Sequence, residues 1–391
     1  MDKNKKKKKY SDGKYVIILA NCTWYLYNFR LDLLKELKKK GFKLILVSTL
    51  DKYYNYISEY FVETNKLFLI RGSENLFFEL ITIFNIFYCY LKYKPKLVHH
   101  FTIKPAIYGS LIARFICIKN VINHITGLGP SFYSNRFKIK FFNNLLKPIY
   151  KYAFNNKKSI CIFHNSNDRD TFIDQGLISP KNTTIIKGSG VEKDHFNNKK
   201  LKDSFNNKIQ ILFPGRIIRE KGIVELIDAC NELWQEEYKF TLNIAGEIDK
   251  HNKSSLQEKN LKKIIINKNI NVIGKSENMY DIYQSMDIVV LPSWREGLSK
   301  SLLEAASMSL PIITTDVPGC NDVIIHKYSG ILVPARDKNA LKNAIKDYLK
   351  NPSYALKYGR NARKYVIQNF TVQKINQEII KLYKNFLNKN D

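Results

Sequence analysis

The sequence predicts an α/β protein in which two doubly wound parallel sheets follow one another along the chain. Short, β-branched apolar runs alternate with longer segments of helical periodicity, and the alternation restarts after a polar stretch near the middle. At 391 residues the chain exceeds one ordinary hydrophobic core, so two domains are expected. Ligands of such sheets bind beyond the carboxyl ends of the strands, and the loops that follow the strands therefore carry the candidate sites.

The first half of the chain has five apolar runs with the length and composition of buried strands. A helix over about residues 29–40, ended by Gly41, separates the first two. The first domain is expected to cover residues 1–191, with residues 1–12 as a basic tail. Its strands are expected at Tyr15–Ala20, Lys43–Ser48, Lys96–His100, Val121–Ile125 and Ser159–His164.

The second half repeats the same alternation. Residues 192–208, which are polar and rich in Asn and Lys, are expected to connect the domains. The second domain is expected over 209–370, followed by a C-terminal helix in 371–391. Its strands are expected at Gln210–Phe213, Phe240–Ala245, Ile270–Ile273, Asp287–Leu291, Pro311–Thr314 and Gly330–Val333.

The composition limits the class of protein. A net charge of +29 favours nucleic acid, anionic membranes or acidic ligands as partners. The six cysteines are scattered without a Cys-x-x-Cys pair, which favours a reducing compartment and argues against a structural zinc site. The apolar run after the basic opening is too short for a secretory signal. The run Leu76–Leu91 is too short to span a bilayer and carries Glu79 and Asn85, so a buried helix is favoured over an interfacial one.

One motif carries the clearest chemistry. Glu296 lies on the loop that leaves the predicted strand ending at Leu291, and Glu304 lies about two turns later in a helix. The helix is expected to begin near Gly297 to Ser299, where unpaired backbone N–H groups suit a phosphate. Two carboxylates that flank an anion site suit a diphosphate between two polyhydroxylated rings, which is the shape of a nucleotide-sugar.

The pattern Pro-Ser-x-x-Glu-Gly-Leu-x-x-x-Leu-Leu-Glu-Ala resembles the donor-site signature of glycosyltransferase family 4. This resemblance implies the GT-B fold, in which two Rossmann-like domains face a cleft, and a retaining reaction. It also implies that Glu304 holds the ribose hydroxyls and Glu296 those of the transferred sugar. The backbone amides of Gly297, Leu298 and Ser299 would meet the diphosphate.

Two cations follow the first predicted strand of the second half. Arg216 follows a Pro-Gly pair, and Lys221 lies five residues later; a guanidinium and an ammonium are able to converge on a diphosphate. The resemblance implies that they neutralise the departing nucleoside diphosphate, so no metal is expected. Gly246 and the loop of Lys275 follow the next strands at positions similar to those of the family. The resemblance implies that Gly246 lets the ligand approach and that the loop of Lys275 contacts the base of the nucleotide.

The segments around Lys104 and Thr126 resemble the acceptor domains of family 4 enzymes that extend undecaprenyl-diphosphate-linked oligosaccharides, nearest to N-acetylgalactosaminyltransferases. The resemblance implies an acceptor site with Lys104, Thr126 and Gly127, although a surface lysine beside a proline turn is an equal alternative for Lys104. Many relatives place a histidine where this chain has Thr126. His124 lies two residues earlier and faces the same way on a strand, so it is a candidate at the reacting centre or a buried core histidine.

A basic and aromatic stretch covers residues 136–158, with seven basic residues and no acidic one. As an amphipathic helix it would suit an anionic lipid surface; the alternative is a solvated face over a core stripe.

The resemblance as a whole implies a cytoplasmic enzyme at the inner face of the cell membrane. It would transfer a sugar, with N-acetylhexosamine favoured, from a UDP-sugar to a lipid-linked saccharide or polysaccharide precursor, without a cofactor. The reaction would be a front-face displacement in which the donor phosphate takes the acceptor proton. Two other hypotheses remain: a GT-B protein that hydrolyses or epimerises a nucleotide-sugar, and a basic nucleic-acid-binding protein, which leaves the paired glutamates unexplained.

Overall fold

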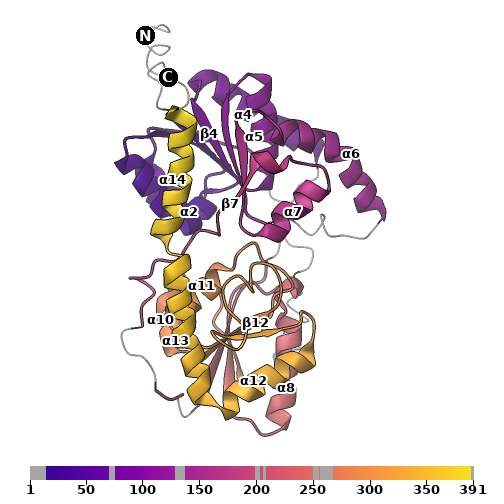
Figure 1. Cartoon of the computed structure of the whole chain (residues 1–391), viewed down its shortest axis with the longest axis vertical. Coiled ribbons are helices and arrows are strands. Elements are labelled where there is room, and N and C mark those ends of the chain that lie inside the picture. The colour runs from indigo at the N-terminus through magenta and orange to yellow at the C-terminus, as the bar shows by residue number, and fades with distance from the viewer. Residues whose placement is uncertain are drawn as a thin grey trace. The chain divides into compact units, whose positions relative to one another are not determined.

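The computed structural model describes residues 15–69, 75–127, 137–198, 203–205, 208–249, 255 and 267–388. The chain divides into two compact units. The first unit comprises residues 1–189 and 375–391, and the second comprises 190–374 (Figure 1). Each unit contains one sheet, and every strand pair in both sheets is parallel.

The first unit has a seven-stranded sheet in the order β3-β2-β1-β4-β5-β6-β7. The order reverses between β1 and β4, which are hydrogen-bonded neighbours although β2 and β3 lie between them in the sequence. The strands are β1 (Tyr15–Ala20), β2 (Lys43–Ser48), β3 (Glu63–Lys66), β4 (Leu97–Phe101), β5 (Asn120–Ile125), β6 (Ser159–Phe163) and β7 (Thr183–Ile185).

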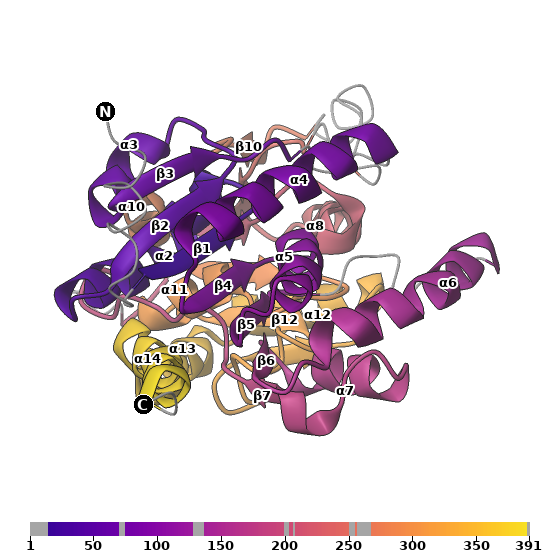
Figure 2. The same ribbon diagram turned by 90° about the horizontal axis from the view of Figure 1, so that it is seen from above.

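Helices cover both faces of this sheet, which is why its strands are apolar on both sides. Side chains from α2 (Thr23–Lys39) and α14 (Val372–Asn388) pack on one face, with Leu34 and Tyr383 fully buried. On the other face lie α4 (Leu76–Tyr93), α5 (Ile103–Phe115) and α7 (Ser166–Asp174) (Figure 2). The remaining helices of this unit are α3 (Tyr54–Ile57), η1 (Ser58–Tyr60), α6 (Phe137–Phe154) and η3 (Pro180–Asn182).

The second unit has a six-stranded sheet in the order β10-β9-β8-β11-β12-β13, which reverses between β8 and β11. Its strands are β8 (Ile209–Pro214), β9 (Phe240–Ala245), β10 (Ile270–Val272), β11 (Ile288–Leu291), β12 (Ile312–Thr315) and β13 (Ile331–Val333). The helices that enclose this sheet in one core are η4 (Arg219–Lys221), α8 (Ile223–Gln235), α10 (Met279–Ser285), α11 (Lys300–Ser307), α12 (Lys338–Lys350) and α13 (Pro352–Asn369).

The predicted fold class is confirmed, and all eleven predicted strands are present within one or two residues. Sequence analysis did not find β3 and β7, because these edge strands are short and carry polar residues instead of an apolar run. The expected connection 192–208 lies within the second unit, where Phe196 packs in the core. The final helix packs on the first unit from Ile375 onward.

The apolar helix predicted from Leu76 is α4. It was predicted to be buried, which is wrong for one of its faces, because that face is exposed. Only five of its residues are buried: Thr82, Ile86, Cys89, Tyr90 and Tyr93. By length and composition α4 is also the one helix of the described ranges that would suit a membrane span. Its buried side chains pack in the core beside β1 and β4, which ties the helix to the sheet.

Candidate active site

The candidate site lies at the point of the second sheet where the strand order reverses. Strands β8 and β11 are neighbours at this point. In doubly wound sheets the loops that follow such a pair lead to opposite sides of the sheet, and ligands bind in the crevice between them. The loop after β8 leads to Lys221, and the loop after β11 leads to Glu296. The topology therefore brings together the two segments that the sequence analysis selected.

An ion pair joins these loops. The Lys221 ammonium contacts Oε1 of Glu296, and the Ser293 hydroxyl donates a hydrogen bond of 2.7 Å to the same oxygen. The lysine and glutamate side chains are 17% and 13% exposed. A carboxylate held by two donors near the surface of a site has a fixed orientation before any ligand arrives, which is what a polar specificity contact requires.

Close backbone packing explains why the loops meet. Gly222, with a φ of 71°, follows Lys221, and a Cβ there would lie 2.0 Å from the Pro292 carbonyl oxygen. The Trp294 amide also donates to the Glu220 carbonyl at 2.8 Å. Only glycine permits this approach, so Gly222 fixes the position of Lys221 against the loop of Glu296.

A second loop supports Glu296 from behind. Gly319 has a φ of 79°, and a Cβ there would lie 2.5 Å from the Glu296 carbonyl oxygen. The Glu296 amide donates to Pro318, and the Ser299 amide donates to Gly319 at 3.0 Å. Ser293 is the serine of the Pro-Ser-x-x-Glu motif, but the motif gave it no role of its own, and Gly319 was not selected from the sequence.

The start of α11 differs in one respect from the expected anion site. The Ser299 side chain caps the helix by accepting a hydrogen bond from the Leu302 amide. The Ser299 amide donates to the Gly319 carbonyl, so a contact between this amide and a diphosphate would require that hydrogen bond to be exchanged and stays a prediction. Gly297 and Leu298 lie on the loop immediately before it, within the expected segment.

Glu304 is buried on the inner side of α11. The Tyr283 hydroxyl donates to its Oε2 at 3.3 Å, and the Lys300 ammonium lies 3.5 Å from its Oε1. Burial raises the pKa of the Glu304 carboxyl above its ordinary value, while Lys300 and Tyr283 oppose that rise. A buried carboxylate needs hydrogen-bond donors, because it is shielded from water. The hydroxyls of a ligand diol would supply such donors to Glu304 in addition to Tyr283 and Lys300.

The other predicted donor residues are more exposed. Arg216 is half-exposed and pairs with Asp249 at 2.5 Å, while Lys275 lies 3.5 Å from Glu247. The contacts of the described residues do not join Arg216 to Lys221 or Glu296. Lys221 and Glu296 therefore form one pair, and the cations Arg216 and Lys275 each pair with another acid outside it. Gly246 has a structural reason to be glycine, since a Cβ there would lie 1.8 Å from the Gly215 carbonyl oxygen.

In the first unit, the predicted acceptor residues lie beyond the carboxyl ends of β4 and β5. Lys104 pairs with Glu79 at 2.5 Å, and the Tyr108 hydroxyl donates to the other oxygen of that glutamate at 2.6 Å. Lys104 is therefore held by α4 and is not a simple surface lysine. Thr126 and Gly127 are partly exposed after β5, while the loop that follows, 128–136, lies outside the described residues.

His124 is fully buried, which corrects the expectation that it acts at the reacting centre. Its Nε2 lies 3.0 Å from His164 Nε2 and 3.0 Å from an amino group of Arg30, itself 2% exposed. Burial and the Arg30 charge hold the pKa of His124 well below its ordinary value. A neutral, enclosed imidazole that accepts from an arginine is a packing group, because substrate has no access to its ring.

The buried Arg30 is the centre of this polar cluster. Its guanidinium donates to the Gly188 carbonyl at 3.2 Å and to the Tyr25 hydroxyl at 3.3 Å, and it lies over the Phe101 ring. No sequence pattern marks this arginine as buried, because Arg30 stands in an ordinary amphipathic helix. Within the described ranges, no group of three His, Cys, Asp or Glu side chains is arranged to hold a metal ion.

Comparison with known proteins finds matches on both units of the chain. The family model for group 1 glycosyl transferases matches residues 194–365, and the model for glycosyl transferase 4-like domains matches residues 16–165. A two-unit fold of this kind, with matches to transferase models on both units, defines a glycosyltransferase with the GT-B fold. The chain therefore carries one domain that matches each of these two glycosyl transferase models.

Two curated relatives match over nearly their whole length. The capsular polysaccharide biosynthesis glycosyltransferase CapM of Staphylococcus aureus is 26% identical, covering 91% of this chain and 93% of CapM. The N,N'-diacetylbacillosaminyl-diphospho-undecaprenol alpha-1,3-N-acetylgalactosaminyltransferase of Campylobacter jejuni is 23% identical, covering 93% of this chain and 97% of that enzyme. Among solved structures, Anabaena Alr3699/HepE in complex with UDP-glucose superimposes with a TM-score of 0.75 at 17% identity, covering 95% and 99% of the two chains.

Proposed function

We propose that this protein is a retaining glycosyltransferase that moves a sugar from a UDP-sugar to a lipid-linked saccharide or polysaccharide precursor. The observation that carries the proposal is the pair of Lys221 and Glu296 at the reversal point of the second sheet. An anionic and a cationic group held side by side suit a ligand that joins a polyhydroxylated sugar to a diphosphate. The names of the two relatives favour polysaccharide precursors and undecaprenyl-linked acceptors.

The proposed chemistry assigns one task to each charged group. Glu296 accepts hydrogen bonds from the sugar hydroxyls, and Glu304 accepts them from the ribose. Lys221, with Arg216 turning from Asp249, stabilises the negative charge on the departing UDP. The bond from the anomeric carbon to UDP breaks as the acceptor oxygen forms its bond on the same face, and a phosphate oxygen of UDP takes the hydroxyl proton. Lys275 and Gly246 border the nucleotide.

N-acetylhexosamine is the sugar that we favour, because the Campylobacter relative is named as an N-acetylgalactosaminyltransferase over almost the same length. Lys104, Thr126 and Gly127 would contact the acceptor, with Lys104 on its phosphate. We place the enzyme at the inner face of the cell membrane, where lipid-linked precursors are available. The basic α6 in 136–158 is one candidate contact; part of that stretch lies outside the described residues.

The test begins with the donor. A thermal-shift screen of the full chain against UDP-, GDP- and ADP-sugars is expected to show a rise in melting temperature with UDP-sugars only, because ligands that bind the native state stabilise it by mass action. The donor found in this way, carrying a radiolabelled sugar, is then incubated with protein and extracted undecaprenyl-linked lipid.

Label is expected in the lipid fraction with wild type and not with Glu296→Ala or Lys221→Ala. Arg219→Ala is the control, since Arg219 is a cation of the same short helix outside the proposed site. Wild-type transfer by both site variants would refute the site. Release of free labelled sugar without lipid labelling would instead favour the hydrolase hypothesis.

A further inference from the structure

The helix α4 carries an exposed apolar stripe along its whole length. The stripe residues follow one another at intervals of three or four, so they lie on one side of the helix. Phe84 is 70% exposed and Phe77 is 66% exposed. The stripe consists of Phe77, Leu80, Phe84, Tyr88 and Leu91. Isolated apolar side chains are common on protein surfaces, but a continuous row of five large ones marks an interaction site.

The opposite side of α4 is apolar as well, and it is the side that holds the helix to the sheet. Ile86, Cys89 and Tyr90 are buried in the core beside β1 and β4. The fold therefore accounts for one apolar side of α4 and leaves the other without a packing role. A helix that only needed to cover the sheet would present polar residues to water on this second side.

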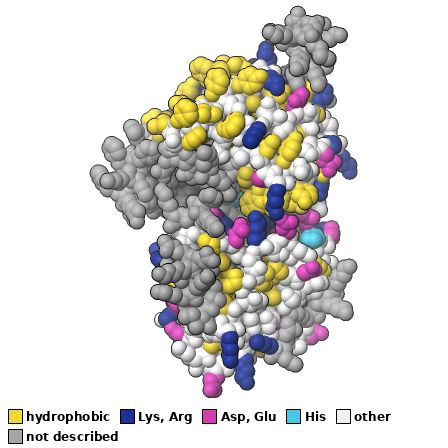
Figure 3. All heavy atoms as spheres, turned by 180° about the vertical axis from the view of Figure 1, so that it is seen from behind, with side chains coloured by type: hydrophobic (Ala, Val, Ile, Leu, Met, Phe, Trp, Pro, Cys, Tyr) yellow, Lys and Arg dark blue, Asp and Glu magenta, His cyan; other side chains and the backbone are white. Residues whose placement is uncertain are grey.

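Neighbouring elements widen the stripe into a surface, which we call the α4 surface. Phe115, at the end of α5, is 74% exposed, and its ring centroid lies 6.2 Å from that of Phe87. Figure 2 shows α5 beside α4 on the same face of the sheet. In the space-filling view, hydrophobic side chains form a broad band on the surface of the first unit (Figure 3).

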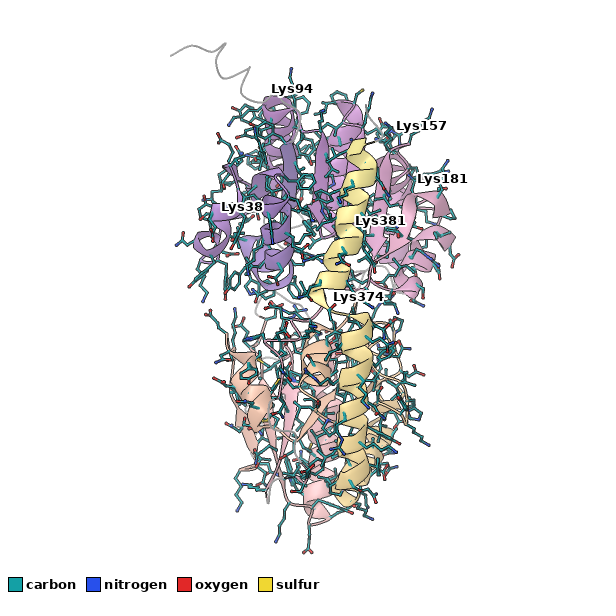
Figure 4. The ribbon with its side chains drawn as sticks, turned by 60° about the vertical axis from the view of Figure 1, so that its left-hand side comes forward. Lys38, Lys94, Lys157, Lys181, Lys374 and Lys381 are labelled. Atoms are coloured by element: carbon teal, nitrogen blue, oxygen red, sulfur yellow. The ribbon has the colours of Figure 1, made fainter. Side chains whose placement is uncertain are left out.

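Basic residues border the α4 surface. Lys92 is exposed in the last turn of α4, and Lys94 and Lys96 are exposed directly after it. Lys119 is exposed four residues after Phe115. Figure 4 shows Lys94 at the outer surface of the first unit. Between Asn75 and Asn120 the sequence holds six basic residues and one acid, Glu79, whose carboxylate is paired with Lys104. Large apolar side chains surrounded by cations are the arrangement that binds the interface of an anionic bilayer.

We propose that the α4 surface docks this protein on an anionic phospholipid membrane, with the stripe at the level of the acyl chains and the lysines at the headgroups. The charge argues against a second copy as the occupant, since a symmetric contact would place the same lysines opposite one another. The packing of Ile86 and Tyr90 in the core argues against a span, because α4 would have to leave the sheet.

The position of the stripe gives this docking a use, and this step rests on the proposed function. Strand β4 follows α4 and runs antiparallel to it, so the first turn of α4 lies at the carboxyl edge of the first sheet. There Glu79 contacts Lys104 and Tyr108 of α5. A saccharide whose lipid tail is held in the bilayer would meet the protein at this edge, next to the predicted acceptor residue.

Vesicle sedimentation of the full chain tests the docking. Two vesicle compositions are used, pure phosphatidylcholine and phosphatidylcholine with 30% phosphatidylglycerol, chosen to separate apolar from charge-dependent binding. The stripe variant is Leu80→Ser with Phe84→Ser, and the border variant is Lys92→Glu with Lys94→Glu. The matched control is Ile325→Ser with Tyr328→Ser, two exposed apolar residues of the second unit. A further variant, Lys147→Glu with Lys151→Glu, tests α6.

Wild type is expected to bind the anionic vesicles at least about tenfold more tightly than the neutral ones. The stripe variant and the border variant should each lose about tenfold or more, while the control binds as wild type does. Equal binding by wild type and the stripe variant would overturn the proposal. So would a loss confined to the α6 variant, or a change from dimer to monomer in the stripe variant with vesicle binding unchanged.

A fluorescence measurement adds a readout of depth. Tryptophan placed by Phe84→Trp should be quenched by brominated lipids in anionic vesicles, whereas tryptophan placed by Ile325→Trp should not. Absence of quenching at both positions would overturn the assignment of the stripe to the acyl chains. UDP-sugar binding, followed by thermal shift, should be the same in the stripe variant and wild type. Failure of the membrane proposal is thus distinguishable from failure of the donor-site proposal.

Discussion

Lys221 and Glu296 lie 75 residues apart in the sequence and form an ion pair in which Ser293 donates to the same carboxylate oxygen. The pair joins the loop after β8 to the loop after β11, where the strand order of the second sheet reverses. An ion pair with side chains less than one-fifth exposed holds each partner in place for a ligand.

Lys221→Met should lower the free energy of unfolding by roughly 1–3 kcal/mol, because it leaves the Glu296 carboxylate poorly solvated and without its cation. Adding Glu296→Gln removes that charge and should recover part of the loss, while sugar transfer stays at least about 100-fold below wild type. Urea unfolding and radiolabel transfer measure the two effects. Recovery of transfer in the double variant would show that the pair has only a structural role.

Gly319→Ala should destabilise the second unit strongly. Its φ of 79° is unfavourable for alanine, and the new Cβ would lie 2.5 Å from the Glu296 carbonyl oxygen, so the loop of Glu296 must move. Gly274→Ala is the matched control, since Gly274 has a φ of 78° and no atom within 4 Å of a new Cβ. The control should cost about 1 kcal/mol and Gly319→Ala clearly more, measured by urea unfolding. Equal losses would contradict the close packing described for Gly319.

Glu304→Gln should raise the stability of the fold and weaken the binding of the donor. Burial raises the pKa of Glu304, so the folded state binds its proton more tightly than the unfolded state does. The stability that this group contributes is present at low pH and is lost as the pH rises above about 4.5, the ordinary value for glutamate. Glutamine does not titrate, so the variant should gain stability on wild type at pH 8 and gain less at pH 4.

The same variant should bind UDP-sugar about tenfold more weakly, because an amide is a poorer partner than a carboxylate for two ribose hydroxyls. Urea unfolding at the two pH values and the KM for donor are the measurements. Tyr283→Phe is the control that removes a hydrogen bond to Glu304 and keeps its charge. A stability difference between Glu304→Gln and wild type that is independent of pH would contradict the inferred pKa direction.

The buried histidines of the first unit predict acid sensitivity. Burial lowers the pKa of His164 to about 3 and of His100 to about 4, against 6.5 for a free imidazole. Between these values the unfolded state binds more protons, so the free energy of unfolding should fall as the pH is lowered from 6.5 toward 4. Each such histidine contributes up to about 1.4 kcal/mol per pH unit in that window.

Unfolding of the first unit can be followed by fluorescence of Trp24 after Trp234→Phe and Trp294→Phe, which remove the tryptophans of the second unit. His100→Gln in this background should reduce the pH slope by up to about 1.4 kcal/mol per unit between pH 6.5 and 4. An unaltered slope in His100→Gln would show that this ring is not the source of the acid sensitivity.

The sequence by itself determined the fold class, the strand positions and the segments of the donor site. These follow from local patterns. A short β-branched run such as 288–291 is typical of a strand that a parallel sheet buries on both sides, and the spacing of Glu296 and Glu304 is a property of one loop and one helix. The edge strands β3 and β7 were not predicted, because their residues are mostly polar and partly exposed and form no apolar run.

The tertiary structure alone decided which groups pair. Lys221 meets Glu296, rather than converging with Arg216, because Gly222 packs on Pro292, a contact between residues distant in the sequence. His124 is enclosed because α2 brings Arg30 to it, and the outer side of α4 is exposed because its other side fills the core. Periodicity shows that a helix has apolar sides, but burial depends on which neighbours the fold supplies to each side.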